Sequence, residues 1–475
     1  MAWLEAIVSW GNNILWTYVL IAMLIILGLY FSIRTKFVQF RLIGDMVKLL
    51  GEGATASGDK KKKGVSSFQA FSISTASRVG TGNLAGVALA ISLGGPGAVF
   101  WMWLIALIGA ASAFVESTLA QIYKVKDDFG FRGGPAYYME KGLNKRWMGI
   151  LFAILITFTF GLVFNAVQTN TISLAFENSF GIDRYVFGIV ISIITAIIIF
   201  GGIKRIARVA EAIVPVMAVL YLLLALYIIV VNISEIPSVI QLIVSSAFGL
   251  EEAIGGGIGA ALMNGIKRGL FSNEAGMGSA PNAAATASVS HPAKQGLIQT
   301  LSVFTDTILI CSATAFMIIL SGVYQGSSDG IQLTQDALTT HVGDWAGILI
   351  SVFIFLFAFS SVVGNYYYGE TNLEFIKPDN KSLILIYRLA VVGMVMFGSI
   401  AKISIVWSLA DLFMALMAVV NLIAITMLGK IAFAALKDYL DQKRAGKNPV
   451  FNPRTIGLKN TEVWDEVSKD YSTDK

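Results

Sequence analysis

The chain has 475 residues, of which 56% are hydrophobic and 14% are charged, and its formal net charge is +5. This composition excludes a soluble globular protein and indicates a polytopic helical membrane protein. The single cysteine, Cys311, excludes an internal disulfide, and two distant histidines, His291 and His341, disfavour a metal enzyme. We therefore expect the lipid bilayer, and no nucleic acid, as a partner.

Apolar runs long enough to cross about 30 Å of hydrocarbon recur along the chain and predict eleven membrane-spanning helices. The expected fold class is an all-α membrane protein. The predicted spans are Asn13–Ile33, Phe68–Leu93, Ala98–Ile122, Trp147–Leu174, Tyr185–Phe200, Ile206–Val231, Ala253–Ala287, Leu297–Leu320, Trp345–Phe375, Leu383–Ile400 and Ile405–Met427.

The basic residues are distributed unevenly between the predicted loops. Of the 35 lysines and arginines, 30 fall in alternate loops, the span ends next to them and the C-terminal tail, two fall in the opposite loops and three lie deep inside spans. Because Lys and Arg stay on the cytoplasmic side, the N-terminus is expected outside and the C-terminus in the cytoplasm. The expected location is the plasma membrane.

The second predicted span cannot be one regular helix, because SRVGTGNLAG (Ser77–Gly86) interrupts it. Non-helical backbone at this depth is tolerated only where it faces protein or a watery cavity. Half-helices at such a break offer N–H groups to an anion and C=O groups to a cation. We expect Thr81, Gly82 and Asn83 to present N–H groups to an amino-acid carboxylate. The alternative is that the glycines only permit close helix packing.

The seventh predicted span is also interrupted, by GGGIG, by GLFSNEAGMG (Gly269–Gly278) and by Pro281. Two interrupted spans at matching positions of two five-span halves are typical of inverted-repeat transporters with a site at mid-membrane. The predicted organisation is an extra helix, a surface helix and a basic loop (1–67), two five-helix repeats (68–232 and 233–427) and a cytoplasmic tail (428–475).

Polar residues on one face of two other spans are further candidates. Gln168 shares a helical face with Phe164 and Thr171 in span four, and it can either bind substrate or join helices. In span nine, Ser361 and Asn365 share a face with Tyr368, and Ser360 lies beside it. Hydroxyl and carbonyl oxygens suit a hard cation.

Buried charges mark a third group of candidates. Asp306 lies inside span eight, where a lone carboxylate is a functional candidate by default. Glu274 lies in the second break and is a candidate ligand, proton site or gate. Both are therefore candidates for a second ion or proton site. The sequence gives no placement for Lys267 and Arg268.

The blocks at these positions resemble a known family. GGPGAVFWMWLIALIG (Gly94–Gly109) resembles the signature of the sodium:alanine (alanine/glycine:cation) symporters, within the amino acid-polyamine-organocation superfamily. VGTGNLAGVA, GLFSNEAGMGSAP and GNYYYGE resemble its other blocks. The resemblance implies the leucine-transporter fold, a five-plus-five inverted repeat preceded here by one extra helix.

The resemblance also implies the sites. The carbonyls of Ala76 and Val79, with the hydroxyls of Ser360 and Ser361, would hold sodium. The substrate would face Thr81, Gly82 and Gln168, together with Phe271 and Ser272. Some alanine-specific relatives have a tryptophan where this chain has Asn365, which favours a larger substrate such as glutamine.

The predicted function is sodium-coupled symport of a small neutral amino acid, alanine, glycine or glutamine. A proton-coupled carrier that uses Asp306 or Glu274 is the alternative. A channel would need a continuous pore, whereas this chain carries its own pair of broken helices. An enzyme would need a nucleophile with a base, or metal ligands, and no such motif is visible in the sequence.

Overall fold

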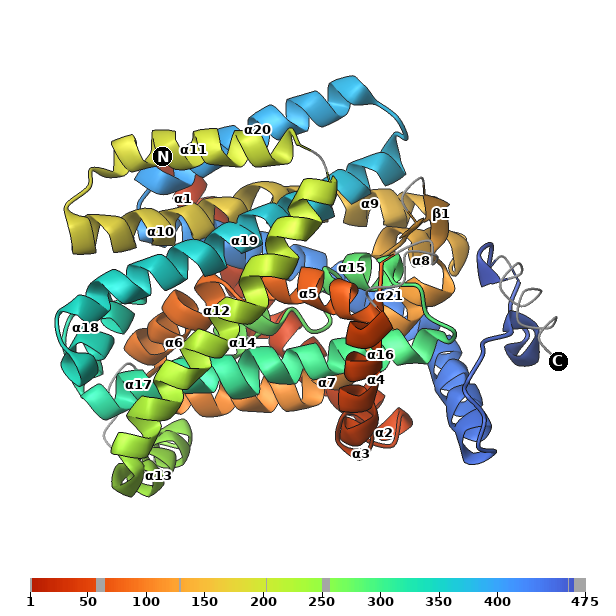
Figure 1. The fold of residues 1–475 in the computed structure, drawn as a ribbon, viewed down its shortest axis with the longest axis horizontal. Helices are drawn as coiled ribbons and strands as arrows, with labels where there is room; N and C mark the ends of the chain where they lie inside the picture. The colour runs from red at the N-terminus through yellow and green to blue at the C-terminus, as the bar shows by residue number, and fades with distance from the viewer. Residues whose placement is uncertain are drawn as a thin grey trace.

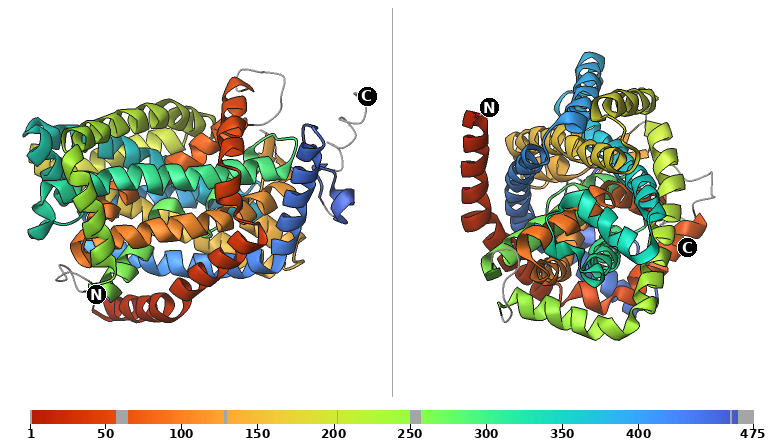
Figure 2. Two further views of the ribbon diagram at one scale, coloured as in Figure 1. Left: turned by 90° about the horizontal axis from the view of Figure 1, so that it is seen from below. Right: turned by 90° about the vertical axis from the view of Figure 1, so that its left-hand side faces the viewer.

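The computed structural model describes residues 2–56, 65–127, 130–201, 203–249, 257–459 and 461–464. The long helices run in roughly the same direction, and the short helices α5 and α15 lie near the middle of the molecule (Figure 1). One end of the molecule carries α13 and α18, and the other carries α4 and the C-terminal segment (Figure 2).

The first half of the chain has these elements: α1 (Ala2–Ile14), η1 (Leu15–Leu20), α2 (Ile21–Arg34), α3 (Val38–Arg41), α4 (Ile43–Ala56), α5 (Ser67–Arg78), η2 (Gly82–Gly86), α6 (Val87–Gly94), α7 (Gly97–Ile122), β1 (Val125–Asp127), β2 (Gly130–Arg132), α8 (Pro135–Lys141), α9 (Arg146–Ile156), η3 (Thr157–Phe164), α10 (Asn165–Phe180), α11 (Arg184–Ile199) and α12 (Ile203–Val231).

The second half has these: η4 (Ile233–Glu235), α13 (Ile236–Ala247), α14 (Gly257–Asn273), α15 (Ala280–Thr286), α16 (Pro292–Val303), η5 (Phe304–Cys311), α17 (Ser312–Ser321), η6 (Val323–Gln325), α18 (Gly330–Val342), α19 (Trp345–Ile376), α20 (Lys381–Ile400), α21 (Ile403–Arg444) and η7 (Pro453–Ile456).

Each predicted span coincides with helix over most of its described residues. Seven helices in the described residues are long and apolar enough to cross a membrane, or eight if a bent pair counts as one span. In that pair, Val216–Val231 and Ile233–Ala247 meet at 77°. The mostly helical membrane architecture is therefore confirmed, whereas the count of eleven and the inverted repeat stay predictions.

The structure adds helices that the span pattern does not predict. Both α13 and α18 lie outside the predicted spans, at the same end of the molecule (Figure 1). At the opposite end, β1 and β2 form an antiparallel hairpin in which Lys126 pairs with Phe131. The helices of the two interrupted spans pack on long neighbours: α14 and α15 contact α7, and α5 contacts α19.

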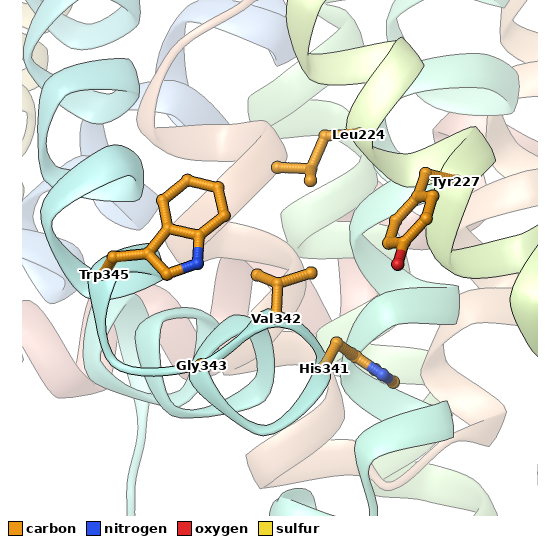
Figure 3. Close-up of a pocket in the computed structure, with 6 residues that line it drawn as sticks. All are labelled: Leu224, Tyr227, His341, Val342, Gly343 and Trp345. Carbon is orange, nitrogen blue, oxygen red and sulfur yellow. The ribbon is translucent and has the colours of Figure 1, made fainter.

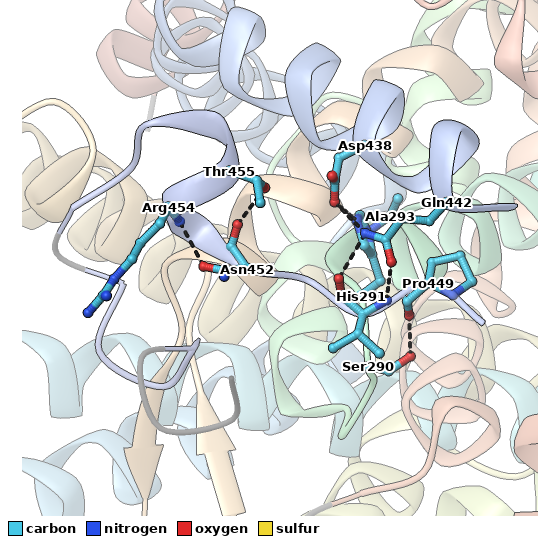
Figure 4. A network of polar contacts seen from close by, with 10 residues as sticks. Ser290, His291, Ala293, Asp438, Gln442, Pro449, Asn452, Arg454 and Thr455 are labelled. Atoms are coloured by element: carbon cyan, nitrogen blue, oxygen red, sulfur yellow. Dashed lines mark hydrogen bonds and ion pairs between the residues drawn. The ribbon is translucent and has the colours of Figure 1, made fainter. Parts of the chain in front are cut away.

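The segment after α21 folds back over this second end of the molecule (Figure 4). Ser290 donates a hydrogen bond to the Pro449 carbonyl (2.8 Å), and the Phe451 N–H donates to the Ser290 carbonyl (2.9 Å). Burial lowers the pKa of His291. The neutral ring accepts from the Ala293 N–H at Nδ1 (3.1 Å) and donates from Nε2 to Asp438 (3.2 Å). The part of the tail that the structure describes, up to residue 464, is therefore part of the folded protein.

Lys124 is the buried base of the same region. Its Nζ donates to the Ala287 carbonyl (2.8 Å), at the end of α15, and lies 4.0 Å from the Phe131 ring centroid. Trp464 is fully buried beside it and donates to the Gln121 carbonyl (2.8 Å). The tail thus contacts the residues that hold the end of the second broken span.

This environment predicts a pH-dependent stability. Burial lowers the pKa of Lys124 to about 7, whereas the value in an unfolded chain is about 10.4. Between these values the unfolded chain binds a proton that the folded protein lacks, so the free energy of unfolding rises with pH by up to about 1.4 kcal/mol per unit. Thermal unfolding in detergent between pH 7 and 9 should show this rise.

Lys124→Met should flatten that rise, whereas Lys126→Met, at an exposed neighbour on β1, should keep it. An equal slope in the parent and Lys124→Met would contradict the assignment.

Candidate functional site

The first break begins where α5 ends at Arg78. Val79 is extended (φ −76°, ψ 97°), and the next N–H, of Gly80, donates to Asn83 Oδ1 (2.9 Å). The Asn83 side chain therefore satisfies a backbone group that the helix leaves free, and the chain resumes as η2 at Gly82. The predicted interruption of this span is present.

The second break separates α14 from α15. Glu274, Gly276 and Gly278 all have positive φ, of 56°, 83° and 90°. Pro281 lies in the first turn of α15, where its missing N–H costs no helical hydrogen bond. The break therefore spans residues 274–279, and Gly255 and Gly256 of the GGGIG block lie outside the described residues.

Gly80 lies against two other helices. A Cβ atom at Gly80 would overlap Ser361 Oγ of α19 and come within 3.0 Å of Gln168 Oε1 of α10. Gln168 Oε1 also accepts a hydrogen bond from the Thr81 N–H (3.0 Å). The Gln168 side-chain oxygen thus already accepts from the Thr81 N–H group, which we expect to donate to a substrate carboxylate. Close packing and anion binding are both compatible with Gly80.

Gly82 lies against the second break. A Cβ atom there would be 3.1 Å from Phe271 Cδ1 and 3.1 Å from Ser272 Cα. The Phe271 ring lies between those of Phe164 and Trp407, with centroid distances of 4.6 and 4.8 Å. Aromatic rings therefore cover this side of the two breaks. Trp407 is a site neighbour that the sequence reasoning missed.

Three of the four predicted sodium ligands meet at one point. Ser361 Oγ lies 3.0 Å from the Ala76 carbonyl oxygen and 3.4 Å from that of Val79. Both serine hydroxyls donate to the Phe357 carbonyl of their own helix, Ser360 at 2.8 Å and Ser361 at 3.1 Å, but among the described residues only the Ser361 hydroxyl also reaches the first break. The structure therefore distinguishes two neighbouring serines that the sequence treats alike.

Asp306 connects the two breaks. Its Oδ1 accepts from Asn83 Nδ2 (2.7 Å), which belongs to the first break, and its Oδ2 accepts from Ser272 Oγ (2.8 Å), beside the second. Thr307 also donates to Oδ2 (2.9 Å). A buried carboxylate that accepts three hydrogen bonds, one from each side of the site and one from its own helix, can transmit a change at one break to the other.

Glu274 and Asn365 share a different partner. Ser77 Oγ lies 3.2 Å from Glu274 Oε1 and 3.0 Å from Asn365 Oδ1, and Ser279 donates to Glu274 Oε2 (2.5 Å). Both predicted residues therefore lie beside the end of α5, next to the sodium candidates.

Glu116 is a buried carboxylate that the sequence reasoning missed. It accepts from the Gly276 N–H (3.1 Å) and from Asn421 Nδ2 (2.8 Å), and Tyr138 donates to Asn421. It therefore fixes the second break to α7 and α21. The rule that selected Asp306, a carboxylate inside a predicted span, would also have found Glu116.

The structure places Lys267 and Arg268, which the sequence left open. Arg268 Nη2 lies 2.6 Å from both carboxylate oxygens of Asp411, and Lys267 Nζ lies 3.5 Å from this carboxylate. The Arg268 guanidinium also lies 4.5 Å from the Trp407 ring centroid. This ion pair joins α14 to α21 above the aromatic rings.

Comparison with known proteins decides the family. The model of the sodium:alanine symporter family matches residues 1–453. The chain belongs to the sodium:alanine symporter family. Its relatives include a probable sodium/glutamine symporter of Bacillus subtilis, 59% identical over 97% of this chain and 96% of that protein. A sodium/alanine symporter of Methanococcus maripaludis is 37% identical over 93% and 99%. A sodium/proton-dependent alanine carrier of Bacillus sp. is 39% identical over 88% and 98%.

The fold of this symporter-family chain is also found in a solved structure, that of MhsT in complex with L-phenylalanine. The TM-score is 0.51 at 15% identity, over 79% of this chain and 96% of that one. At this identity the likeness shows the fold alone. Together, the family and the relatives indicate cation-coupled amino-acid transport.

A surface pocket of about 550 Å³ lies between α12 and the turn that joins α18 to α19 (Figure 3). It is lined by Leu224, Tyr227, His341, Val342, Gly343 and Trp345. None of these is a predicted site residue, whereas predicted site residues from both interrupted spans meet at the two breaks. We therefore place the candidate site at the two breaks.

Proposed function

We propose that this protein is a sodium-coupled symporter that imports a small neutral amino acid across the plasma membrane by alternating access. The observation that carries the proposal is the meeting of two broken helices at one point, next to oxygens suited to sodium. Interrupted helices at mid-membrane are the usual construction of such sites.

The two ligands would bind on adjacent sides of the first break. The N–H groups of Thr81 and Gly82 would bind the substrate carboxylate once Gln168 moves away from Thr81. The carbonyls of Ala76 and Val79, with Ser361, would bind sodium. These oxygens are neutral and do not titrate near pH 7, which favours sodium over a proton at this point.

The driving force is sufficient for concentrative uptake. One sodium ion that enters at −100 mV contributes ~2.3 kcal/mol, and a tenfold gradient adds ~1.4 kcal/mol. The sum, ~3.7 kcal/mol, supports roughly a 500-fold accumulation of a neutral amino acid with one-to-one coupling.

Proton coupling is the second candidate, and the buried carboxylates of Asp306 and Glu274 favour it. One relative is described as sodium/proton-dependent. Uptake of radiolabelled alanine, glycine and glutamine into proteoliposomes, with sodium and proton gradients imposed separately, tests both. Accumulation on a sodium gradient alone supports the proposal, and accumulation on a proton gradient without sodium would contradict it.

We also propose the orientation with the N-terminus outside and the C-terminus inside, within the predicted division into residues 1–67, 68–232, 233–427 and 428–475. The distribution of basic residues supports it. In whole cells, Ser327→Cys should react with an impermeant thiol reagent, whereas Lys447→Cys should not. Both positions are exposed, and the parent, whose only cysteine is the buried Cys311, is the background control. The reverse pattern would overturn the orientation.

A further inference from the structure

The last residue of α5 carries a buried charge without a hydrogen bond. Arg78 is 2% exposed, and none of its three guanidinium nitrogens has a partner among the described residues. The buried carboxyl groups of Glu116, Glu274 and Asp306 lie within electrostatic range of this guanidinium. Leaving a buried charged donor unpaired is costly, so such a group points to a ligand that accepts from it.

Two neutral donors beside Arg78 are also unpaired within the described part of the chain. They are Asn365 Nδ2 and the Tyr368 hydroxyl, whose side chains are 1% and 0% exposed. The Asn365 oxygen accepts from Ser77 Oγ (3.0 Å), and the Tyr368 hydroxyl lies near Ser77 and Arg78. Three kinds of donor thus lie around the end of α5 without an acceptor.

Glu274 supplies a hydrogen-bond acceptor beside these donors. Glu274 accepts hydrogen bonds from Ser77 and Ser279, one on each carboxylate oxygen, and each oxygen can accept more than one. The negative charge of Glu274 also offsets the positive charge of Arg78. The region therefore has spare donors and an acceptor.

We propose that Arg78, Glu274, Asn365 and Tyr368 form a subsite that binds a carboxamide side chain of the transported amino acid. The carboxamide oxygen has two lone pairs. It accepts from Arg78 and Tyr368, its NH₂ group donates to Glu274, and Asn365 lies beside these groups. The inference rests on the proposed function and names its substrate class, an amino acid with a terminal amide such as glutamine.

The position of the subsite fits this substrate. Arg78 precedes the sodium candidate Val79 by one residue, and Glu274 follows Ser272 by two. The step from Ser361 to Asn365 rises about 6 Å along α19. A glutamine side chain spans this distance from a main chain bound at the first break, whereas an alanine methyl group does not.

The chemistry of the subsite excludes close analogues. Methionine has a similar length, but it would leave the buried donors and Glu274 unpaired. Glutamate would bring a second negative charge against Glu274 and could not donate to it. Sites built to hydrogen-bond a polar group reject an analogue that lacks this group by large factors.

Competition for uptake into proteoliposomes tests the subsite. We expect glutamine to inhibit amino-acid uptake at a concentration at least about 100-fold lower than the concentration of methionine or glutamate that is needed. Tyr368→Phe should reduce this preference for glutamine over methionine, measured as the ratio of the two inhibitory concentrations, by about tenfold, with no loss of thermal stability, because the hydroxyl has no hydrogen-bond partner among the described residues. A purely structural tyrosine would not move this ratio. Asn365→Trp should shift preference from glutamine toward alanine and glycine.

Tyr221→Phe is the matched control. Its hydroxyl is buried on α12 and bonded to Thr314 (2.6 Å), and it is no part of the proposed subsite, so the ratio should stay at the parent's value. If sodium drives alanine uptake but methionine inhibits it at the same concentration as glutamine, the subsite is overturned and the proposed function is not. Uptake that requires chloride would also overturn the subsite, because an inorganic anion would then occupy the donors. If none of these amino acids is taken up on a cation gradient, the proposed function fails and the subsite fails with it.

Discussion

Ser361→Ala should raise the sodium concentration for half-maximal uptake by at least about tenfold. The Ser361 hydroxyl is the side-chain oxygen that reaches the Ala76 and Val79 carbonyls, at 3.0 and 3.4 Å. The variant removes one ligand from the proposed sodium site and leaves the two carbonyls in place. Sodium affinity should therefore fall, while substrate affinity at saturating sodium should change less.

Ser360→Ala is the matched comparison, since it removes the same group from the adjacent position. The Ser360 hydroxyl donates to the Phe357 carbonyl of its own helix and, unlike that of Ser361, makes no hydrogen bond to the first break among the described residues, so the sodium dependence should change much less than in Ser361→Ala. The double variant should resemble Ser361→Ala. Equal effects of the two single variants would show that both serines bind sodium, as the family resemblance implies. If Ser361→Ala kept the parent's sodium dependence, we would abandon this site.

Asp306→Asn should reduce transport by more than about 100-fold. The carboxylate accepts from Asn83 and Ser272 on the two sides of the site. An amide keeps the shape, but its NH₂ group would face one of these donors. Each buried hydrogen bond to a charged group is worth about 1.5–3 kcal/mol, and two of them account for this loss.

The control is Asp336→Asn, which makes the same change in α18, where Asp336 accepts from Ser328 (2.7 Å) and not from Asn83 or Ser272. Transport by this variant should stay close to that of the parent. Initial uptake and substrate exchange should be measured together. If Asp306→Asn retained exchange and lost only accumulation driven by a proton gradient, Asp306 would be a proton carrier instead of a connection between the breaks.

The sequence predicted the two interruptions because glycines and charges within an apolar run have few structural alternatives. It predicted Asp306 and Asn83 separately, but not their contact, because the two residues are 223 positions apart. The same limit applies to Arg268 and Asp411, which are 143 positions apart. Such pairs depend on tertiary packing, which hydropathy does not encode.

Other features depend on side-chain conformation or on short amphipathic helices. Ser360 and Ser361 are the same residue type on one helix, and only the hydroxyl geometry separates them. The helices α13 and α18 are too short to be detected as spans. The sequence of the tail is mostly polar, yet its Phe451 and Trp464 side chains are fully buried.

The most direct test of the account is equilibrium binding to the purified protein in detergent, without any gradient. If sodium and the amino acid bind next to each other at the first break, each should raise the affinity for the other by the same factor. We expect sodium to increase amino-acid affinity at least about tenfold in titration calorimetry, and the amino acid to increase sodium affinity equally. Amino-acid binding with the same affinity in sodium and in a sodium-free buffer would contradict a shared site at the two breaks.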